Sequence, residues 1–342
     1  CYIAGETWSN IPLEEIINMK ADWPADKDAP IAVYCGSGHR STIAMTILYS
    51  YGYTNVTSLK GGFGAWASAG YPVEGAPASL DDAFNTFLAD MEGYNTISLD
   101  ALNEMMIDST PFLLDVRNTS ETEAAGYIPG SVTIPLRDLT ANLSYLPAED
   151  TTIVAYCGSG WRCTIALTML EMMGWDDVKG LKGGSFAGWV EAGYAVEEGL
   201  PADPEMLDAY TPDAALVAAA TDALALVPEG WGVTTSDTLN TMLVENPDLI
   251  LIDVRTAAEV EENGIIAAEN WSNIPLEELI NMKANWPDEL DAPIVVYCGS
   301  GHRSTIAMSI LYTYGYTNVG SLKGGFGEWA SAGFPVAEYV AP

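Results

Sequence analysis

The stretch VYCGSGHRS covers residues 296–304 and places a cysteine where an apolar run meets a glycine-rich loop. The run up to Tyr297 is typical of a strand buried on both faces, and Ser304–Tyr314 carries apolar residues at helical spacing. A cysteine at such a junction lies beside backbone N–H groups that have no partner inside the helix. Because two glycines let the backbone curl without obstructing side chains, the loop predicts an anion cradle that lowers the pKa of the thiol.

The same loop is present three times along the chain. Residues 34–41 read YCGSGHRS, residues 297–304 repeat them, and residues 156–163 read YCGSGWRC. Each loop precedes a helix-like stretch, a glycine, a short apolar stretch, and then the letters LKGG with a tryptophan a few residues later. A buried cysteine at a strand end is common by itself. Three cysteines in the same setting favour a shared chemical role over a purely structural one.

The three copies are not equally similar. At a constant offset of 263, residues 1–73 match residues 264–336 at 58 of 73 positions, whereas the middle copy is more distant. The chain therefore reads as two near-identical domains around an unlike one. The expected domains cover residues 1–75, 96–199 and 234–342, and the expected helical linkers cover residues 76–95 and 200–233.

The first copy begins later in the repeat than the third. In the third copy, residues 234–263 precede the matched region and include LILIDVR at 249–255. The middle copy has a counterpart, FLLDVR, at 112–117. We expect a first domain that is short of this strand, and a natural chain that extends upstream as part of a longer domain array or that self-associates.

Each copy alternates strand and helix patterns, which predicts a mainly parallel α/β sheet. In the third copy the expected strands are Ile250–Val254, Ile294–Tyr297 and a short one up to Leu322, and Pro275 is expected to open a helix. Both linkers contain predicted helices, which we expect to pack between domains. The first follows the capping residue Ser79 and runs to about Met91, and the second runs from Ala214 to Leu226.

Charge and composition exclude several classes of partner. The chain carries 47 acidic and 13 basic residues, a formal charge of −34. Nucleic acid and anionic lipid both need a basic surface, so neither is an expected partner. The most apolar helical stretch, Ala214–Val227, is shorter than the ~20 residues of a membrane span, so the chain is not expected to be embedded in a membrane. Five cysteines are too few for a disulfide scaffold.

The combination of repeated motifs resembles the rhodanese-like domains of the sulfurtransferase family. In the third copy the matching motifs are DVR at 253–255, NIPL at 273–276, the loop at 297–304, and LKGG at 322–325 with Trp329. The middle copy matches through DVR at 115–117, GYIPGS at 126–131, IPL at 134–136 and its own loop. The resemblance implies a five-stranded parallel sheet flanked by helices in each copy. It also implies a cysteine that carries a persulfide between a sulfur donor and an acceptor.

Loop length separates two related chemistries. Each loop counts six residues from its cysteine to its arginine, as in Cys298 to Arg303, and related phosphatases use a loop one residue longer. A shorter loop leaves less room for a tetrahedral phosphate and suits a single terminal sulfur. The sequence therefore favours sulfur transfer over phosphate hydrolysis, with no metal or organic cofactor required.

The expected site follows from the loops. The nucleophiles would be Cys35, Cys157 and Cys298, which take sulfur from a small donor such as thiosulfate and give it to a thiol acceptor. The arginines would hold an oxyanion such as the leaving sulfite. The residues expected to line the substrate sites are Gly36, Ser37, Gly38, His39, Arg40, Gly158, Ser159, Gly160, Trp161, Arg162, Gly299, Ser300, Gly301, His302 and Arg303.

The loops differ in ways that bear on function. Trp161 replaces the histidine of the outer copies and would narrow the middle site, while His39 and His302 either line the loop or act as a general acid or base. Cys163 replaces a serine and is either a resolving thiol for Cys157 or a serine-like residue at the helix start.

The DVR motifs predict structural ion pairs. In this interpretation Asp115 pairs with Arg117 and Asp253 pairs with Arg255, with Glu123 or Glu259 as candidate partners.

Two further functions are alternatives to sulfur transfer by an enzyme. One is a structural array of rhodanese folds, for example on a cell surface, which near-identical copies and an acidic surface would suit. The other is a persulfide carrier or sensor with slow turnover. Intact cysteine loops in all three copies favour retained chemistry, because a purely structural array has no need of them.

Overall fold

The computed structural model describes residues 2–3, 9, 11–35, 38–62, 65–66, 69, 71, 73–74, 79–207 and 209–339. The chain divides into two units, Cys1–Pro77 and Ala78–Pro342. The first unit holds the first copy of the repeat, and the second unit holds the middle and third copies.

The middle and third copies each fold around a five-stranded parallel sheet, and the two sheets have the same strand order. The middle sheet has the order β5 (Thr96–Ile97), β9 (Val178–Leu181), β8 (Ile153–Tyr156), β6 (Phe112–Asp115) and β7 (Ser131–Thr133). The third sheet has the order β10 (Val233–Thr234), β15 (Val319–Leu322), β14 (Ile294–Tyr297), β11 (Ile250–Asp253) and β13 (Asn270–Asn273). The mainly parallel α/β fold predicted from the alternating patterns is confirmed.

The central strands explain where the cysteine loops lie. Every residue of β8 and β14 is buried, which is why these strands read as unbroken apolar runs. Asp115 of β6 is in register with Tyr156 of β8, and Asp253 of β11 is in register with Tyr297 of β14. Each cysteine therefore follows the last residue of a central strand, at the carboxyl edge of the sheet where parallel strands present ligand sites.

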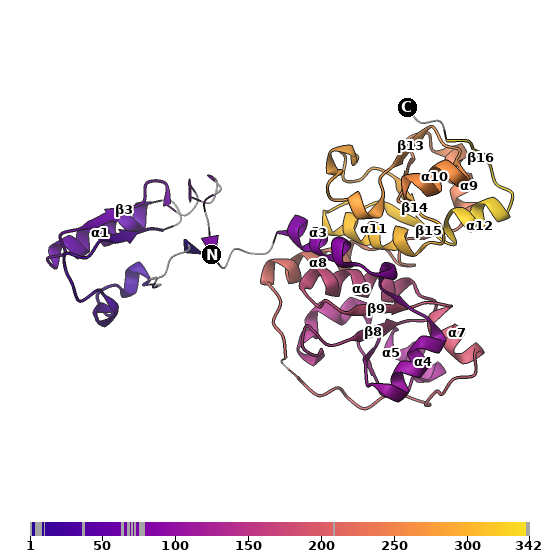
Figure 1. Ribbon diagram of the computed structural model, residues 1–342, viewed down its shortest axis with the longest axis horizontal. Helices are drawn as coiled ribbons and strands as arrows, with labels where there is room; N and C mark the ends of the chain where they lie inside the picture. The colour runs from indigo at the N-terminus through magenta and orange to yellow at the C-terminus, as the bar shows by residue number, and fades with distance from the viewer. Residues whose placement is uncertain are drawn as a thin grey trace. The chain divides into compact units, whose positions relative to one another are not determined.

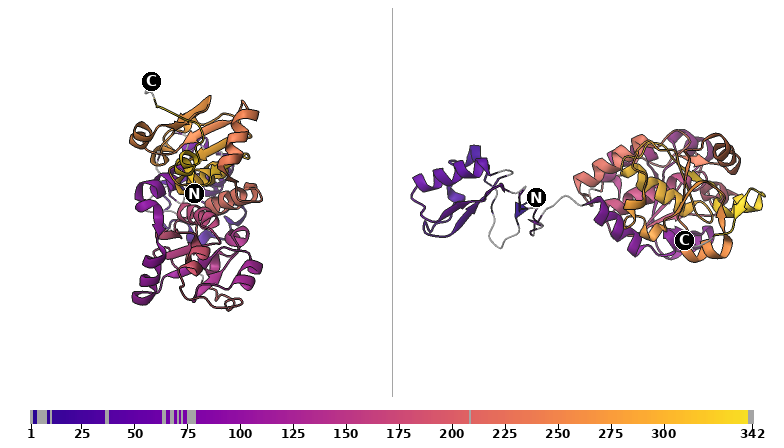
Figure 2. Two further views of the ribbon diagram at one scale, coloured as in Figure 1. Left: turned by 90° about the vertical axis from the view of Figure 1, so that its right-hand side faces the viewer. Right: turned by 90° about the horizontal axis from the view of Figure 1, so that it is seen from above.

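Four helices lie between the two sheets (Figure 1). They are α3 (Leu80–Asp90), α6 (Trp161–Met173), α8 (Ala214–Leu226) and α11 (His302–Thr313). One hydrophobic cluster runs through both copies across these helices, and Figure 2 shows the same stacking from a second direction. Eleven of the thirteen residues of α6 are buried, as is typical of a helix enclosed on all sides.

Both linker helices match their predicted bounds and pack between the copies. The Ser79 hydroxyl caps α3 by accepting a hydrogen bond from the Asp82 N–H at 3.3 Å, and Asp213 caps α8. Asp81 of α3 then binds the third copy, where it accepts hydrogen bonds from Lys283 and, at 2.6 Å, from Tyr314. The linkers are thus part of the interface between the two domains.

The remaining helices of the second unit are shorter than these four. The α-helices are α4 (Leu99–Asp108), α5 (Thr119–Ala125), α7 (Ser185–Glu191), α9 (Ser236–Glu245), α10 (Ala257–Asn263) and α12 (Gly325–Ser331). The 3-10 turns are η3 (Gly93–Asn95), η4 (Leu136–Ala141), η5 (Leu143–Tyr145), η6 (Leu276–Glu278) and η7 (Lys283–Asn285), and β12 (Ile265–Ile266) pairs with β16 (Val336–Ala337). Pro275 therefore opens a 3-10 turn and not the predicted longer helix. Some of the 3-10 turns, such as η4 and η6, pack against the helices between the sheets. Within the described ranges, no helix has the length and apolar character needed to cross a membrane.

The first unit is smaller than the other two copies. It contains α1 (His39–Ser50), a parallel pair of β2 (Ile31–Val33) and β3 (Val56–Ser58), and an antiparallel pair of β1 (Tyr2–Ile3) and β4 (Val73–Glu74), with 3-10 turns η1 (Leu13–Glu15) and η2 (Lys20–Asp22). Its described core is formed by Leu48, Tyr53 and Val56. In the described part of this unit the parallel sheet has two strands, so the expected five-stranded sheet holds for the middle and third copies only.

Candidate active site

The three loop cysteines share one geometry. The sulfur of Cys35, Cys157 or Cys298 accepts a hydrogen bond from the N–H of the second loop glycine, at 3.1 Å in every copy. These glycines have φ angles of 93°, 106° and 102°, which a residue with a side chain adopts only with strain. In each copy, therefore, one N–H of the predicted cradle points at the sulfur.

The repeated LKGG motif orients the backbone of the cysteine loop. The helices that follow the LKGG letters donate to loop carbonyls: Phe326 N–H binds the Cys298 carbonyl at 2.7 Å, and Phe186 N–H binds the Cys157 carbonyl at 2.9 Å. A Cβ on Gly325 would lie 2.3 Å from the Cys298 carbonyl oxygen, so a side chain there would require the loop to shift. Because the loop carbonyls point toward α7 and α12, the loop N–H groups are left to face the thiol.

The environment of Cys157 favours the thiolate. The cysteine is 1% exposed, and burial alone would raise the pKa of its thiol. Hydrogen bonds from the Cys163 thiol and from the N–H groups of Ser159, Gly160 and Cys163 outweigh that effect and lower the pKa to about 6. The same contact, together with burial, raises the pKa of Cys163, so Cys163 keeps its proton.

Cys163 makes the contact that serine makes in the other copies. Its thiol donates to the Gly160 carbonyl at 3.1 Å, as the hydroxyls of Ser41 and Ser304 donate to the corresponding glycine carbonyls at 3.0 Å. The Ser304 hydroxyl also lies 3.6 Å from the Cys298 sulfur. The residue after the loop arginine therefore lies in the first turn of α6 or α11, and its side chain lies beside the loop cysteine.

The loop arginines are engaged by carboxylates. Arg162 donates to both oxygens of Glu121 at 2.5 and 2.7 Å, and Arg303 donates to both oxygens of Glu259 at 2.7 and 2.6 Å. Arg303 lowers the pKa of Glu259 to about 2. The guanidinium nitrogens that we expected to hold an oxyanion therefore bind a carboxylate. Through these ion pairs the arginines connect the loops to α5 and α10.

The DVR ion pairs are present, but with other partners than expected. Arg117 binds Asp115 at 2.5 Å in the middle copy, and both side chains are almost fully buried. The third member is the Gly126 carbonyl at 2.7 Å, not Glu123, and the Thr122 hydroxyl also donates to Asp115.

The third copy repeats this arrangement. Arg255 binds Asp253 at 2.5 Å and the Gly264 carbonyl at 2.7 Å. Glu259, which we expected beside this pair, binds Arg303. Spacing along the chain could not distinguish the two, because α10 brings Glu259 to the loop and not to the strand end.

The middle and third loops meet at the domain interface. The outer end of the Trp161 ring lies 3.5 Å from the place a Cβ would take on Gly301. The His302 ring contacts the Thr164 hydroxyl at 3.1 Å and the Tyr94 carbonyl at 2.8 Å, and burial lowers the pKa of His302. A neutral imidazole held at both nitrogens supports a positioning role for His302 more than a general acid or base role.

The exposed part of each of these two loops is its tip. Ser159 and Ser300, between the two loop glycines, are exposed, whereas Cys157, Cys298, Arg162 and Arg303 are buried.

The loop of the first copy is more open. Cys35 is partly buried, His39 and Arg40 are exposed, and Gly36 and Ser37 lie outside the described residues. A cavity of about 390 Å³ beside this loop is lined by Gly38, Thr42, Met45, Ser58, Leu59, Lys60 and Gly61.

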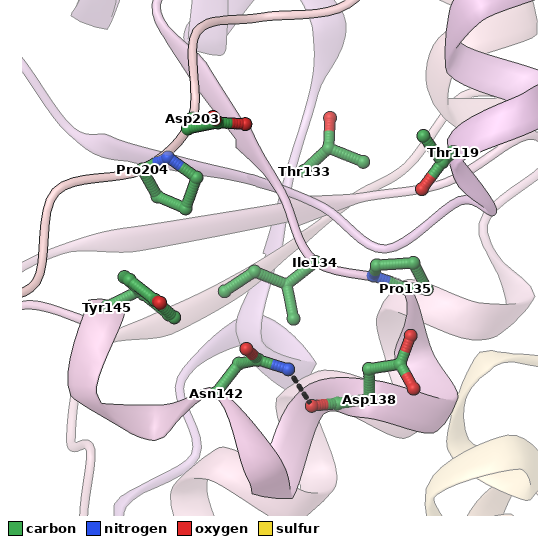
Figure 3. Close-up of a pocket in the computed structure, with 9 residues that line it drawn as sticks. All are labelled: Thr119, Thr133, Ile134, Pro135, Asp138, Asn142, Tyr145, Asp203 and Pro204. Atoms are coloured by element: carbon green, nitrogen blue, oxygen red, sulfur yellow. Dashed lines mark hydrogen bonds between the residues drawn. The ribbon is translucent and has the colours of Figure 1, made fainter.

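A separate cavity of about 430 Å³ lies at the β6–β7 edge of the middle copy (Figure 3). Its lining is Thr119, Thr133, Ile134, Pro135, Asp138, Asn142, Tyr145, Asp203 and Pro204. None of these residues belongs to the cysteine loop, so this cavity is distinct from the loop. Over the residues that the structure describes, no cluster of three or more His, Cys, Asp or Glu side chains is placed to hold a metal ion.

Residues 4–69, 98–192 and 235–332 each match the profile of the rhodanese-like domain, together more than half of the chain. The chain belongs to the rhodanese-like domain family. The family and its sulfurtransferase members support sulfur transfer as the general chemistry, carried out by a transferase of rhodanese type.

Several rhodanese relatives are sulfurtransferases. A sulfurtransferase of Allochromatium vinosum is 35% identical over 107 residues, which cover 31% of this chain and 92% of that protein. The 3-mercaptopyruvate sulfurtransferase of Escherichia coli is 29% identical over 264 residues, which cover 64% of this chain and 86% of that protein. Among solved structures, SseA from Escherichia coli matches with 22% identity and a TM-score of 0.34, covering 68% of this chain and 99% of that one.

Sequence reasoning missed two sets of contacts with the loop arginines, those of Glu121 and Glu259 and those of the rings of Tyr94 and Trp231. Glu121 and Glu259 occupy the third position of α5 and α10, where each carboxylate also completes a capping box. Glu259 was expected beside Asp253, and neither carboxylate was connected with a loop arginine. Tyr94 and Trp231 lie in the linkers, and nothing local in the sequence connects them to a loop in another domain.

Proposed function

We propose that this rhodanese-type protein moves sulfane sulfur from a small thiosulfate-like donor to a thiol acceptor, with Cys35, Cys157 and Cys298 as carriers. The observation that supports it most is the repeated contact between each loop sulfur and a glycine N–H at 3.1 Å. Such donors stabilise a thiolate before attack and a persulfide after it.

The reaction has two steps in this proposal. The cysteine thiolate attacks the outer sulfur of the donor, a new S–S bond forms, and the donor's S–S bond breaks with its electron pair going to the leaving sulfite. An acceptor thiolate then attacks the terminal sulfur of the persulfide, and the cysteine leaves as a thiolate. Because neither step needs a proton shuttle in the loop, a neutral His302 and a Trp161 in the same position are both compatible with it.

The arginines support the reaction through position and charge. Arg162 and Arg303 keep their positive charge while their forks bind Glu121 and Glu259. They fix the loop against a neighbouring helix and offset part of the negative charge of the thiolate. In this proposal they are positioning residues.

In this proposal the single thiol proton of Cys163 turns from the Gly160 carbonyl to the Cys157 sulfur when Cys157 is a thiolate, so that Cys163 acts as its hydrogen-bond donor. Its pKa is raised, and a protonated thiol is a poor nucleophile, so we favour this role over that of a resolving thiol.

A thiosulfate:cyanide assay tests the function, with the wild type, each single Cys→Ser variant of the three carriers, and the triple variant. Activity that falls stepwise and is lost in the triple variant supports an enzyme. Intact-mass and peptide analysis after thiosulfate treatment should place one added sulfur atom on each carrier. Stable sulfur loading without turnover would favour the carrier or sensor, and no loading would favour the structural array. Sulfur found mainly on Cys1 or Cys163 would contradict the assignment of carriers.

A further inference from the structure

Two short turns occupy equivalent positions, each directly before the first strand of the middle or the third domain. Tyr94 lies two residues before β5 of the middle domain, and Trp231 lies two residues before β10 of the third domain. Both have positive φ angles, 58° and 63°, in a conformation that a side-chain-bearing residue rarely adopts. A strained backbone retained at two equivalent aromatic positions suggests that the surrounding contacts hold these side chains in place.

Tyr94 reaches the loop of the third domain. Its ring lies 4.9 Å from the Arg303 guanidinium, and its hydroxyl accepts a hydrogen bond from Arg303 at 3.3 Å. The His302 ring contacts the Tyr94 carbonyl at 2.8 Å. The loop that carries Cys298 is therefore bounded on one side by a linker residue that lies just before β5 of the middle domain.

Trp231 makes the reverse contact. It lies in the linker just before β10 of the third domain, and its ring lies 5.7 Å from the guanidinium of Arg162 and 4.6 Å from that of Arg137, both in the middle domain. Arg137 also donates to the Val227 carbonyl at 2.6 Å, which holds the turn against the middle domain. Each domain thus places one aromatic ring over the loop arginine of the other.

The arginines connect these rings to the thiols. A terminal nitrogen of Arg162 lies 3.5 Å from the place of a Cβ on Gly158, and Arg303 has the same distance to Gly299. Gly158 and Gly299 directly follow Cys157 and Cys298. Each aromatic ring therefore covers a guanidinium that packs against the residue next to the reactive sulfur.

We propose that Tyr94 and Trp231 determine which reagents reach the thiols, because each ring covers the cysteine loop of the opposite domain. Tyr94 limits access to Cys298, and Trp231 limits access to Cys157. Each ring closes one side of a site in the other domain, which leaves the exposed loop tip as the approach. The sites then take small reagents and disfavour bulky ones. The effect on acceptors rests on the proposed sulfur transfer, whereas the effect on access to the thiols does not.

The positive φ angles provide the test variants. Glycine adopts this conformation without strain, so Tyr94→Gly and Trp231→Gly remove a cover while the backbone of the turn is retained. Tyr94→Phe and Trp231→Phe keep an aromatic ring and serve as conservative controls. Thermal unfolding of each full-length variant identifies any general loss of structure.

The experiment measures the alkylation rates of Cys157 and Cys298 separately, by peptide mapping, with iodoacetamide as the small reagent and pyrenyl maleimide as the bulky one. For Tyr94→Gly we expect the ratio of bulky to small rates to rise about tenfold at Cys298, equivalent to about 1.4 kcal/mol of activation free energy, and to stay unchanged at Cys157, because the ring obstructs the bulky reagent more than the small one. Trp231→Gly should give the reverse pattern, and the Phe variants should resemble the wild type.

Only this crossed pattern supports the proposal. Equal changes at both cysteines, no change, or a change confined to the domain that carries the substitution would overturn it. Alkylation does not depend on sulfur transfer, so a failure here is distinct from a failure of the proposed function. If transfer is observed, Tyr94→Gly should also speed transfer from Cys298 to a peptide thiol more than to a small thiol.

Discussion

The middle and third domains have the same sheet order, loop length and sulfur contact, but they surround the sulfur differently. Cys163 and Trp161 of the middle loop correspond to Ser304 and His302 of the third loop. In the middle domain a thiol beside Cys157 helps to lower its pKa to about 6, and in the third domain a hydroxyl lies 3.6 Å from Cys298. The two domains thus place different first-turn side chains beside the same backbone contact, a thiol in one and a hydroxyl in the other.

The shared parts should respond equally to substitution, and the buried DVR ion pairs should show the largest effect. Asp115→Asn and Asp253→Asn each leave a buried arginine without its charge partner, so each should destabilise its domain by about 3–5 kcal/mol. Urea unfolding of the full chain measures this, and Glu262→Gln at an exposed position serves as the control. An unequal effect in the two domains would show that the pairs are not equivalent.

The sequence predicts those features of the fold and site whose determinants lie within a few residues of one another. The strands, the cysteine loops and the linker helices were predicted because apolar runs, glycines and capping residues act within a few positions. The contacts of His302 and Arg303 with Tyr94 cross 208 and 209 residues, and no local pattern encodes them.

Equivalent residues of the near-identical first and third copies differ in how far they are buried. In α11, which packs against α6 and α8, Ile306 and Tyr312 are 0% and 1% exposed, whereas in the first unit taken by itself their counterparts in α1, Ile43 and Tyr49, are 44% and 46% exposed. The residues are the same, so the difference comes from the neighbouring elements. Sequence identity therefore predicts the helix but not which of its faces is covered.

The difference between Cys163 and Ser304 should appear in the pH dependence of the thiols. Cys163→Ala removes a donor to the Cys157 thiolate and should raise the pKa of Cys157 by about 1–2 units, the worth of one hydrogen bond to a charged group. The rate of iodoacetamide alkylation against pH, followed at Cys157, measures it. Ser304→Ala is the matched variant, followed at Cys298. An unshifted profile at Cys157 would show that Cys163 does not support the thiolate.

The same lowered pKa links the middle domain's stability to pH. Because the folded pKa of Cys157 lies below its ordinary value of 9.0, its thiolate contributes stability that is full above pH 9 and is lost as the pH falls through about 6. Wild type should therefore lose more stability than Cys157→Ser between pH 9 and pH 6. Urea midpoints at both pH values measure this, and parallel curves for the two proteins would contradict it.

The smallest effects concern the position before the loop arginine, where the two domains differ most in chemistry. His302 contacts both Thr164 and Tyr94, so His302→Phe should leave buried polar groups without a partner and destabilise the interface by about 1–3 kcal/mol. Trp161 fills the corresponding place by packing, and over the described part of the chain its buried indole N–H has no hydrogen-bond partner. Trp161→Phe removes that unsatisfied donor but also some packing, so the two effects oppose each other and the change should stay within about 1 kcal/mol. Unfolding midpoints of the two Phe variants compare them directly. A larger loss for Trp161→Phe than for His302→Phe would show that packing, and not hydrogen bonding, holds the two loops together.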